Sequence, residues 1–110
     1  MVKIQEKDRQ ILRTILGYID GIQRTHVSFR NDRDAFLGNP DYQYSVAFAL
    51  LQIGELTGRL DVDIPDKASI KALRNRIVHG YGTVNREVLW EASHQPVKDL
   101  RNAIETLLGV

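Results

Sequence analysis

Residues 11–22 read ILRTILGYIDGI, and their apolar side chains recur every three or four positions. This spacing places them on one stripe of an α-helix, which we expect to cover about residues 5–26. The stripe comprises Ile4, Ile11, Leu12, Ile15, Ile19 and Ile22. No stretch of the chain shows the sustained alternation of a half-buried strand. The sequence therefore predicts an all-α fold, an up-and-down bundle of four to five helices.

A second helix is expected over about residues 40–60. Asn39 is suited to cap it, and Pro40 fits the first helical position. Its apolar stripe comprises Tyr42, Val46, Ala49, Leu50, Ile53, Leu56 and Leu60. Residues 34–37, just before it, are expected to form a short turn anchored by two apolar side chains at its end.

Both long helices contain a pair of glycines one turn apart, Gly17 and Gly21 in the first and Gly54 and Gly58 in the second. A glycine inside a helix costs about 1 kcal/mol relative to alanine. We expect the two helices to pack as an antiparallel pair that approaches closely at these glycines. The alternative is that the glycines only mark frayed helix ends.

Three further helical segments are expected after a break at residues 61–65. One covers about residues 66–78 and ends at Gly80, a residue that can take the positive φ common after a helix. Asn85 is suited to cap the next helix. Pro96 interrupts the backbone hydrogen bonds or starts the last amphipathic helix.

The composition indicates a single globular domain spanning residues 1–110. Apolar residues make up 43% of the chain and charged residues 26%, and cysteine is absent. The chain therefore has neither disulfides nor thiolate chemistry, and we expect a cytoplasmic protein. Its longest apolar runs are too short for a membrane span, and its first residues are too charged for a signal peptide.

The net charge of +1 gives no overall attraction to nucleic acid, so any such binding requires a local basic patch. The candidates for this patch are Lys67, Lys71, Arg74, Arg76 and Arg86, although a solvated helix face explains the same scatter. The three histidines show no metal-ligand spacing, so we expect no metal and no cofactor. We expect His26 and His94 to lie at the surface or at helix ends.

The segment Leu73–Tyr81, LRNRIVHGY, gathers side chains that handle phosphate and protons. Arg74 and His79 would point about 140° apart on an uninterrupted helix. They can share a site if the helix ends near Val78 and His79 turns back. They can also do so if two copies of the segment face each other across a two-fold axis.

An arginine and a histidine together are sufficient for RNA cleavage without a metal. Histidine can take the proton from a ribose 2′-hydroxyl or protonate the leaving 5′-oxygen, and arginine can stabilise the charge on the phosphorus centre. The non-catalytic alternatives are that His79 interacts with the helix dipole and that Arg74 or Arg76 pairs with Glu55. Glu55 lies in an apolar helix and is either solvated or paired with an arginine, because a buried charge needs a partner.

Arg74–Tyr81 matches the Arg-x4-His-x-Tyr motif, and the chain resembles the HepT toxins of the HEPN superfamily of helical ribonucleases over nearly its whole length. Leu51–Glu55, Ile64–Pro65 and Val88–Glu91 also resemble segments of that family. The chain departs from the family where Asp66 follows Pro65, because a tryptophan is common there. This change removes an aromatic anchor from the start of the helix and affects the expected packing there.

The resemblance implies a helical homodimer with the motif segments at its interface, acting on RNA as a metal-independent ribonuclease toxin. It implies that Arg74 and His79 are the catalytic pair and that Asn75 helps to hold the site. We expect Arg76 and Glu55 to support the site as well. Tyr81 would be the phenol to which the partner antitoxin, a minimal nucleotidyltransferase of the MntA type, adds AMP. The alternative function is a non-catalytic helical module that binds a nucleotide or a partner, or only dimerises.

Overall fold

The computed structural model describes residues 3–110 and contains helices as its regular elements. The elements, in chain order, are α1 (Glu6–Ser28), α2 (Arg33–Gly38), α3 (Pro40–Thr57), α4 (Lys67–Gly80), the 3₁₀ turn η1 (Tyr81–Thr83), α5 (Arg86–Ala92) and α6 (Gln95–Leu108). The predicted all-α bundle is confirmed. The turn expected at residues 34–37 is the short helix α2.

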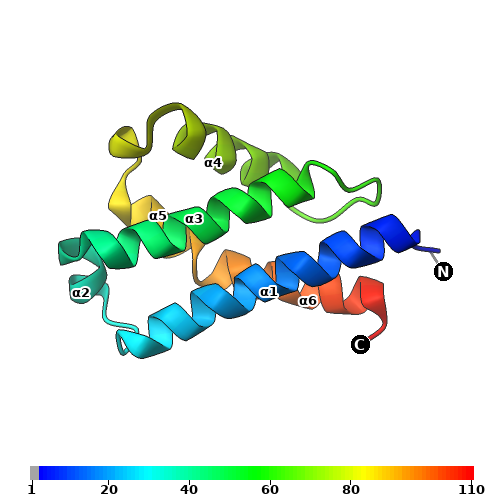
Figure 1. The fold of residues 1–110 in the computed structure, drawn as a ribbon, viewed down its shortest axis with the longest axis horizontal. Helices are drawn as coiled ribbons and strands as arrows, with labels where there is room; N and C mark the ends of the chain where they lie inside the picture. Colours follow the sequence, from blue (N-terminus) through cyan, green and yellow to red (C-terminus); the bar gives the residue numbers. More distant parts are fainter. Residues whose placement is uncertain (1–2) are drawn as a thin grey trace.

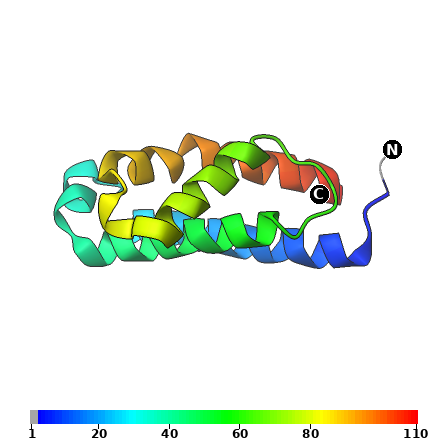
Figure 2. The same ribbon diagram turned by 90° about the horizontal axis from the view of Figure 1, so that it is seen from above.

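The long helices α1 and α3 lie side by side and run in opposite directions (Figure 1). Helices α5 and α6 follow one another along the opposite long edge of the molecule, and α6 packs on α1 (Figure 2). Helix α4 crosses diagonally between these two edges and contacts α3 and η1. The position of the motif therefore depends on how α4 is held against α3.

The core between the helices consists of the stripes that the sequence predicts. The fully buried side chains include Leu12, Ile15, Ile19 and Ile22 of α1, Tyr42 and Val46 of α3, Leu89 of α5 and Ile104 of α6. Asn39 caps α3 through hydrogen bonds from the backbone N–H groups of Asp41 and Tyr42, and Pro40 occupies the first turn, as expected. Asn85 caps α5 in the same way.

His26 and His94 both lie at helix ends, as expected, in the last turn of α1 and at the N-cap of α6, but His26 is not at the surface. His26 is 6% exposed, and its Nδ1 accepts a hydrogen bond from the Tyr42 hydroxyl. Its Nε2 lies 2.9 Å from Ser93 Oγ, which itself donates to the Trp90 carbonyl oxygen. The His94 ring is stacked on His26 at a centroid distance of 4.2 Å. Burial, with His94 adding to it, lowers the pKa of His26 to about 4, so its ring is neutral at pH 7 and links α1, α3 and α5.

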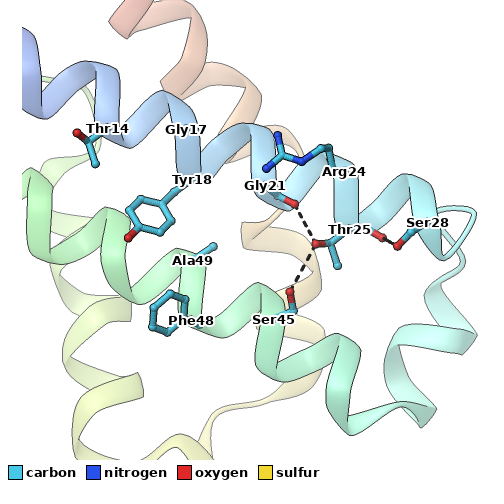
Figure 3. A pocket seen from close by; sticks show the side chains of 10 residues that line it. All are labelled: Thr14, Gly17, Tyr18, Gly21, Arg24, Thr25, Ser28, Ser45, Phe48 and Ala49. Carbon is cyan, nitrogen blue, oxygen red and sulfur yellow. Dashed lines mark hydrogen bonds between the residues drawn. The ribbon is translucent and has the colours of Figure 1, made fainter.

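The glycines of α1 do not lie at a close helix crossing. A Cβ on Gly17 would meet nothing within 4 Å, and one on Gly21 would meet only the end of the Arg24 side chain. Figure 3 shows both glycines beside an open groove of about 740 Å³ between α1 and α3, with Tyr18 and Phe48 at its side. The prediction that all four glycines mark the α1–α3 crossing is therefore wrong.

Gly54 does mark a close crossing, but between α3 and α4. A Cβ on this glycine would lie 2.5 Å from Arg74 Cβ and 2.9 Å from its Cγ. Real Cβ atoms do not approach this closely, so the hydrogen of glycine is what lets the stem of Arg74 lie directly on α3. The close packing of α4, which carries the motif, offsets the helix-propensity cost of Gly54.

The ends of α4 differ from the sequence prediction. The helix begins at Lys67, after Asp66, which takes the left-handed conformation with φ of 62° and makes no side-chain capping bond. It continues through Gly80, whose φ of −178° is extended, so the predicted positive φ is wrong. Gly80 instead accepts a hydrogen bond from Thr83 Oγ1 through its carbonyl oxygen at 2.7 Å, and the chain turns directly into η1.

Of the other long helices, α4 packs only on α3. A groove of about 550 Å³ therefore remains between α4 and the helices α5 and α6. Pro65 and Asp66 line one end of it, beside Ile70 and Leu73. Asp66 stands here in place of the tryptophan that the sequence resemblance leads one to expect. Among residues 3–110, no helix combines the length and apolarity needed to cross a bilayer.

The two glycine environments predict opposite effects of the same substitution. Gly17→Ala should raise the free energy of unfolding by about 1 kcal/mol, since it gains helix propensity without a clash. Gly54→Ala should lower it by about 1–3 kcal/mol, because Arg74 and α4 must move away from the new methyl group. Chemical denaturation of both variants measures this difference. A Gly54→Ala variant as stable as Gly17→Ala would contradict the close crossing.

Candidate active site

The guanidinium of Arg74 is held on α3 by Glu55. Arg74 Nε donates to Glu55 Oε1 at 2.5 Å, and its Nη2 forms an ion pair with the same oxygen. Arg74 Nη1 donates to Asn75 Oδ1 at 2.9 Å. The interpretation of Glu55 as a carboxylate paired with an arginine is therefore confirmed. Both charged side chains are about one-third exposed, at 31% and 35%, so the pair remains within reach of a ligand.

His79 lies in the last turn of α4 and is exposed. It forms no side-chain hydrogen bond to any residue of the described range 3–110. Because the helix continues through Gly80, His79 does not leave the helix to turn back toward Arg74. The two residues therefore point about 140° apart within one chain. The arrangement in which His79 turns back toward Arg74 within one chain is not the one that α4 forms.

Arg76 belongs to another surface. It lies two positions after Arg74, about 200° around the helix, and lines the groove between α4 and the α5–α6 edge. The structure does not bring it to the cluster formed by Glu55, Arg74 and Asn75.

Tyr81 follows the end of α4 and is partly buried against Tyr44 of α3, with ring centroids 5.4 Å apart. Burial raises the pKa of Tyr81, Tyr44 raises it further, and the positive charge of Arg86 opposes this rise. The phenol is therefore protonated at neutral pH. Tyr81 is more than a cap over the helix end, because its ring packs beside an exposed aromatic residue and an arginine.

Sequence reasoning identified Glu55 but missed two aromatic residues that share its face of α3, Tyr44 and Phe48. Tyr44, Phe48 and Glu55 fall within about 40° of one another around the helix. Two of them contact the motif, since Tyr44 meets Tyr81 and Glu55 meets Arg74. Their spacing of four and seven residues was visible in the sequence, but it mixes two aromatic residues with a carboxylate and so does not stand out as an apolar stripe.

No group of three or more metal-ligating side chains occurs in the range 3–110. The motif region offers a fixed guanidinium, an exposed imidazole and a phenol. A guanidinium offers N–H donors that match phosphate oxygens, and an imidazole transfers protons near neutral pH.

A comparison with protein families matches residues 15–107 to the model described as ribonuclease HepT-like. The chain belongs to the HepT-like ribonuclease family. The match contains α3, α4 and η1, and with them Glu55, Arg74, His79 and Tyr81.

Curated relatives of this HepT-like chain carry names of the same kind. Putative RNase MJ0125 of Methanocaldococcus jannaschii is 25% identical over 108 residues, covering 91% of this chain and 90% of the relative. Putative RNase MJ1216 of the same organism is 23% identical over 106 residues, covering 91% and 86%. No solved structure gives a significant match.

Proposed function

We propose that this HepT-like chain is the toxin of a toxin–antitoxin pair and cleaves RNA without a metal ion. The observation that carries the proposal is the arginine fixed by Glu55 and Asn75 in a chain that also exposes His79 on the same helix. Three nitrogens of Arg74 are oriented by these contacts, and both terminal nitrogens keep N–H groups for phosphate oxygens.

The proposed reaction is an internal transfer within the RNA. His79 removes the proton of a ribose 2′-hydroxyl, or gives one to the departing 5′-oxygen, while the 2′-oxygen attacks the neighbouring phosphorus. The P–O bond to the 5′-oxygen breaks, and the products are a 2′,3′-cyclic phosphate and a 5′-hydroxyl. Arg74 stabilises the negative charge that builds up on the phosphorus oxygens.

The site is completed by a second copy of the chain, with the two motif segments facing each other. The divergence of Arg74 and His79 on one continuous α4 supports this arrangement, because an isologous dimer brings each residue close to the partner's copy of the other. Two exposed apolar side chains also support it. Phe48 of α3 is 55% exposed and Val78 of α4 is 47% exposed. Helix geometry places Phe48 on the same face of α3 as Tyr44 and Glu55, and Val78 one turn after Arg74.

Cleavage in the presence of EDTA tests the proposed reaction. The purified protein should convert single-stranded RNA into fragments ending in a 2′,3′-cyclic phosphate, whereas DNA of the same sequence should resist. Arg74→Ala and His79→Ala should each slow cleavage by about 100-fold or more, since each removes a group that acts on the reacting atoms. Arg13→Ala, which removes an exposed arginine from α1, a helix that does not pack on α4, should leave the rate unchanged.

Unchanged cleavage in both the Arg74→Ala and the His79→Ala variants would contradict the assignment of the site. Saturable RNA or nucleotide binding without any cyclic-phosphate product would instead support the alternative function, a non-catalytic binding module.

The antitoxin in this proposal is a minimal nucleotidyltransferase of the MntA type that transfers AMP from ATP to Tyr81. The phenolic oxygen attacks the α-phosphorus of ATP, and pyrophosphate leaves. Because the raised pKa keeps this phenol protonated, the transferase must accept its proton. The added nucleotide would place a bulky anion two residues from His79 and repel the RNA phosphates.

Incubation with a cognate nucleotidyltransferase and ATP should add the mass of one or more AMP groups to the protein and inhibit RNA cleavage. Tyr81→Phe should abolish both effects, while Tyr44→Phe, which removes the neighbouring hydroxyl, should still gain the mass. Intact-mass spectrometry distinguishes these results. A Tyr81→Phe variant that gains the same mass would show that the acceptor is another residue.

A further inference from the structure

Arg86, the first residue of α5, is fixed in place by a neutral side chain. Its Nε donates a hydrogen bond to Gln43 Oε1 of α3 at 2.9 Å. Arg86 is an exposed residue, and its terminal nitrogens make no hydrogen bond to any residue of the described range 3–110. One hydrogen bond from Nε sets the plane of the guanidinium and leaves its two terminal nitrogens free to bind an anion side by side.

Gln43 is itself rigid. It is 3% exposed, and its Nε2 donates to the carbonyl oxygens of Phe36 at 2.7 Å and Leu37 at 3.1 Å. These two acceptors fix which end of the amide is the nitrogen. The oxygen must therefore point toward Arg86, and the arginine is held by a buried group that cannot turn around without losing its own hydrogen bonds.

Arg86 differs from the other arginines of residues 3–110 that are held by a side chain, because the group that holds it is not a carboxylate. Arg33, Arg74 and Arg101 are held by Glu87, Glu55 and Asp20 respectively, so each already has an anionic partner. Arg86 forms no ion pair within the same range and keeps its full positive charge. A guanidinium that is positioned but not neutralised is suited to bind an external anion.

Two aromatic rings lie near Gln43, the residue that holds this arginine. Tyr44, the neighbour of Gln43 on α3, is 56% exposed and packs on Tyr81. Arg86 is close enough to Tyr81 to offset part of the rise in its pKa. Exposed aromatic faces next to a cation are the combination that binds single-stranded nucleic acid, since bases stack on the rings and the cation contacts the backbone.

We infer that Arg86, oriented by Gln43, binds a backbone phosphate of the single-stranded RNA substrate while a neighbouring base stacks on Tyr44. This inference rests on the proposed ribonuclease function and extends the RNA path from the Arg74–His79 region across η1 to the start of α5. Arg86 acts on binding and register, and it takes no part in the proton transfers.

Binding of a labelled single-stranded RNA with 2′-O-methyl groups, which cannot be cleaved, tests the inference by fluorescence anisotropy at several salt concentrations. Arg86→Gln should weaken binding about tenfold. It should also reduce the slope of log K against log salt by about 0.7, the loss of one phosphate contact. Arg59→Gln makes the same change in charge roughly 24 Å away along α3 and should change neither quantity appreciably.

Two further variants separate orientation from charge. Arg86→Lys should keep the salt slope but bind about threefold more weakly, because lysine offers neither the planar pair of donors nor the bond to Gln43. Tyr44→Ala should weaken binding with little change in slope, since stacking releases no counterions. Melting temperatures of all variants show whether each one is folded under the assay conditions.

Equal losses in Arg86→Gln and Arg59→Gln would overturn the inference, since the effect would then be one of overall charge. Unchanged binding in Arg86→Gln would overturn it as well. Because the RNA cannot be cleaved, the result is independent of turnover. If the protein binds this RNA through Arg86 but never cleaves RNA, the proposed function is contradicted, whereas the inference that Arg86 binds phosphate is supported.

Discussion

The contact between Arg74 and α3 determines where the motif lies. Helix α4 has no other long helix to pack on, and at its crossing with α3 the stem of Arg74 occupies the space that any side chain at position 54 would need. The next residue, Glu55, then binds the guanidinium. A partly exposed ion pair of this kind contributes about 1 kcal/mol or less to stability, so its main effect is to orient the arginine.

Much of the fold follows from local features of the sequence. Helix periodicity identifies α1 and α3, and Asn39 and Asn85 cap their helices as expected because capping depends on residues two or three positions apart. The sequence also suggests that Glu55 pairs with an arginine, because a carboxylate that is buried in an apolar helix needs a partner for its charge. Which arginine it binds depends on the α3–α4 crossing.

The errors concern contacts between residues far apart in the chain. His26 lies at a helix end as expected, but it is also buried and hydrogen-bonded to Ser93, 67 residues away, and no local pattern indicates that partner. Glycine spacing does not reveal which helix approaches, so Gly54 was assigned to α1 rather than α4. Gln43 and Arg86 are 43 positions apart and were not linked for the same reason. The motif itself was recognisable because its residues are consecutive, whereas the side chains that position them are not.

The central claim is that one functional site takes Arg74 from one chain and His79 from another. Mixing the Arg74→Ala and His79→Ala proteins under conditions that exchange subunits tests it most directly. Random exchange makes about half of the dimers mixed, and one of the two sites in each mixed dimer has both groups, so RNA cleavage should recover to about a quarter of the wild-type rate. A mixture that stays as inactive as its separate components would contradict the account.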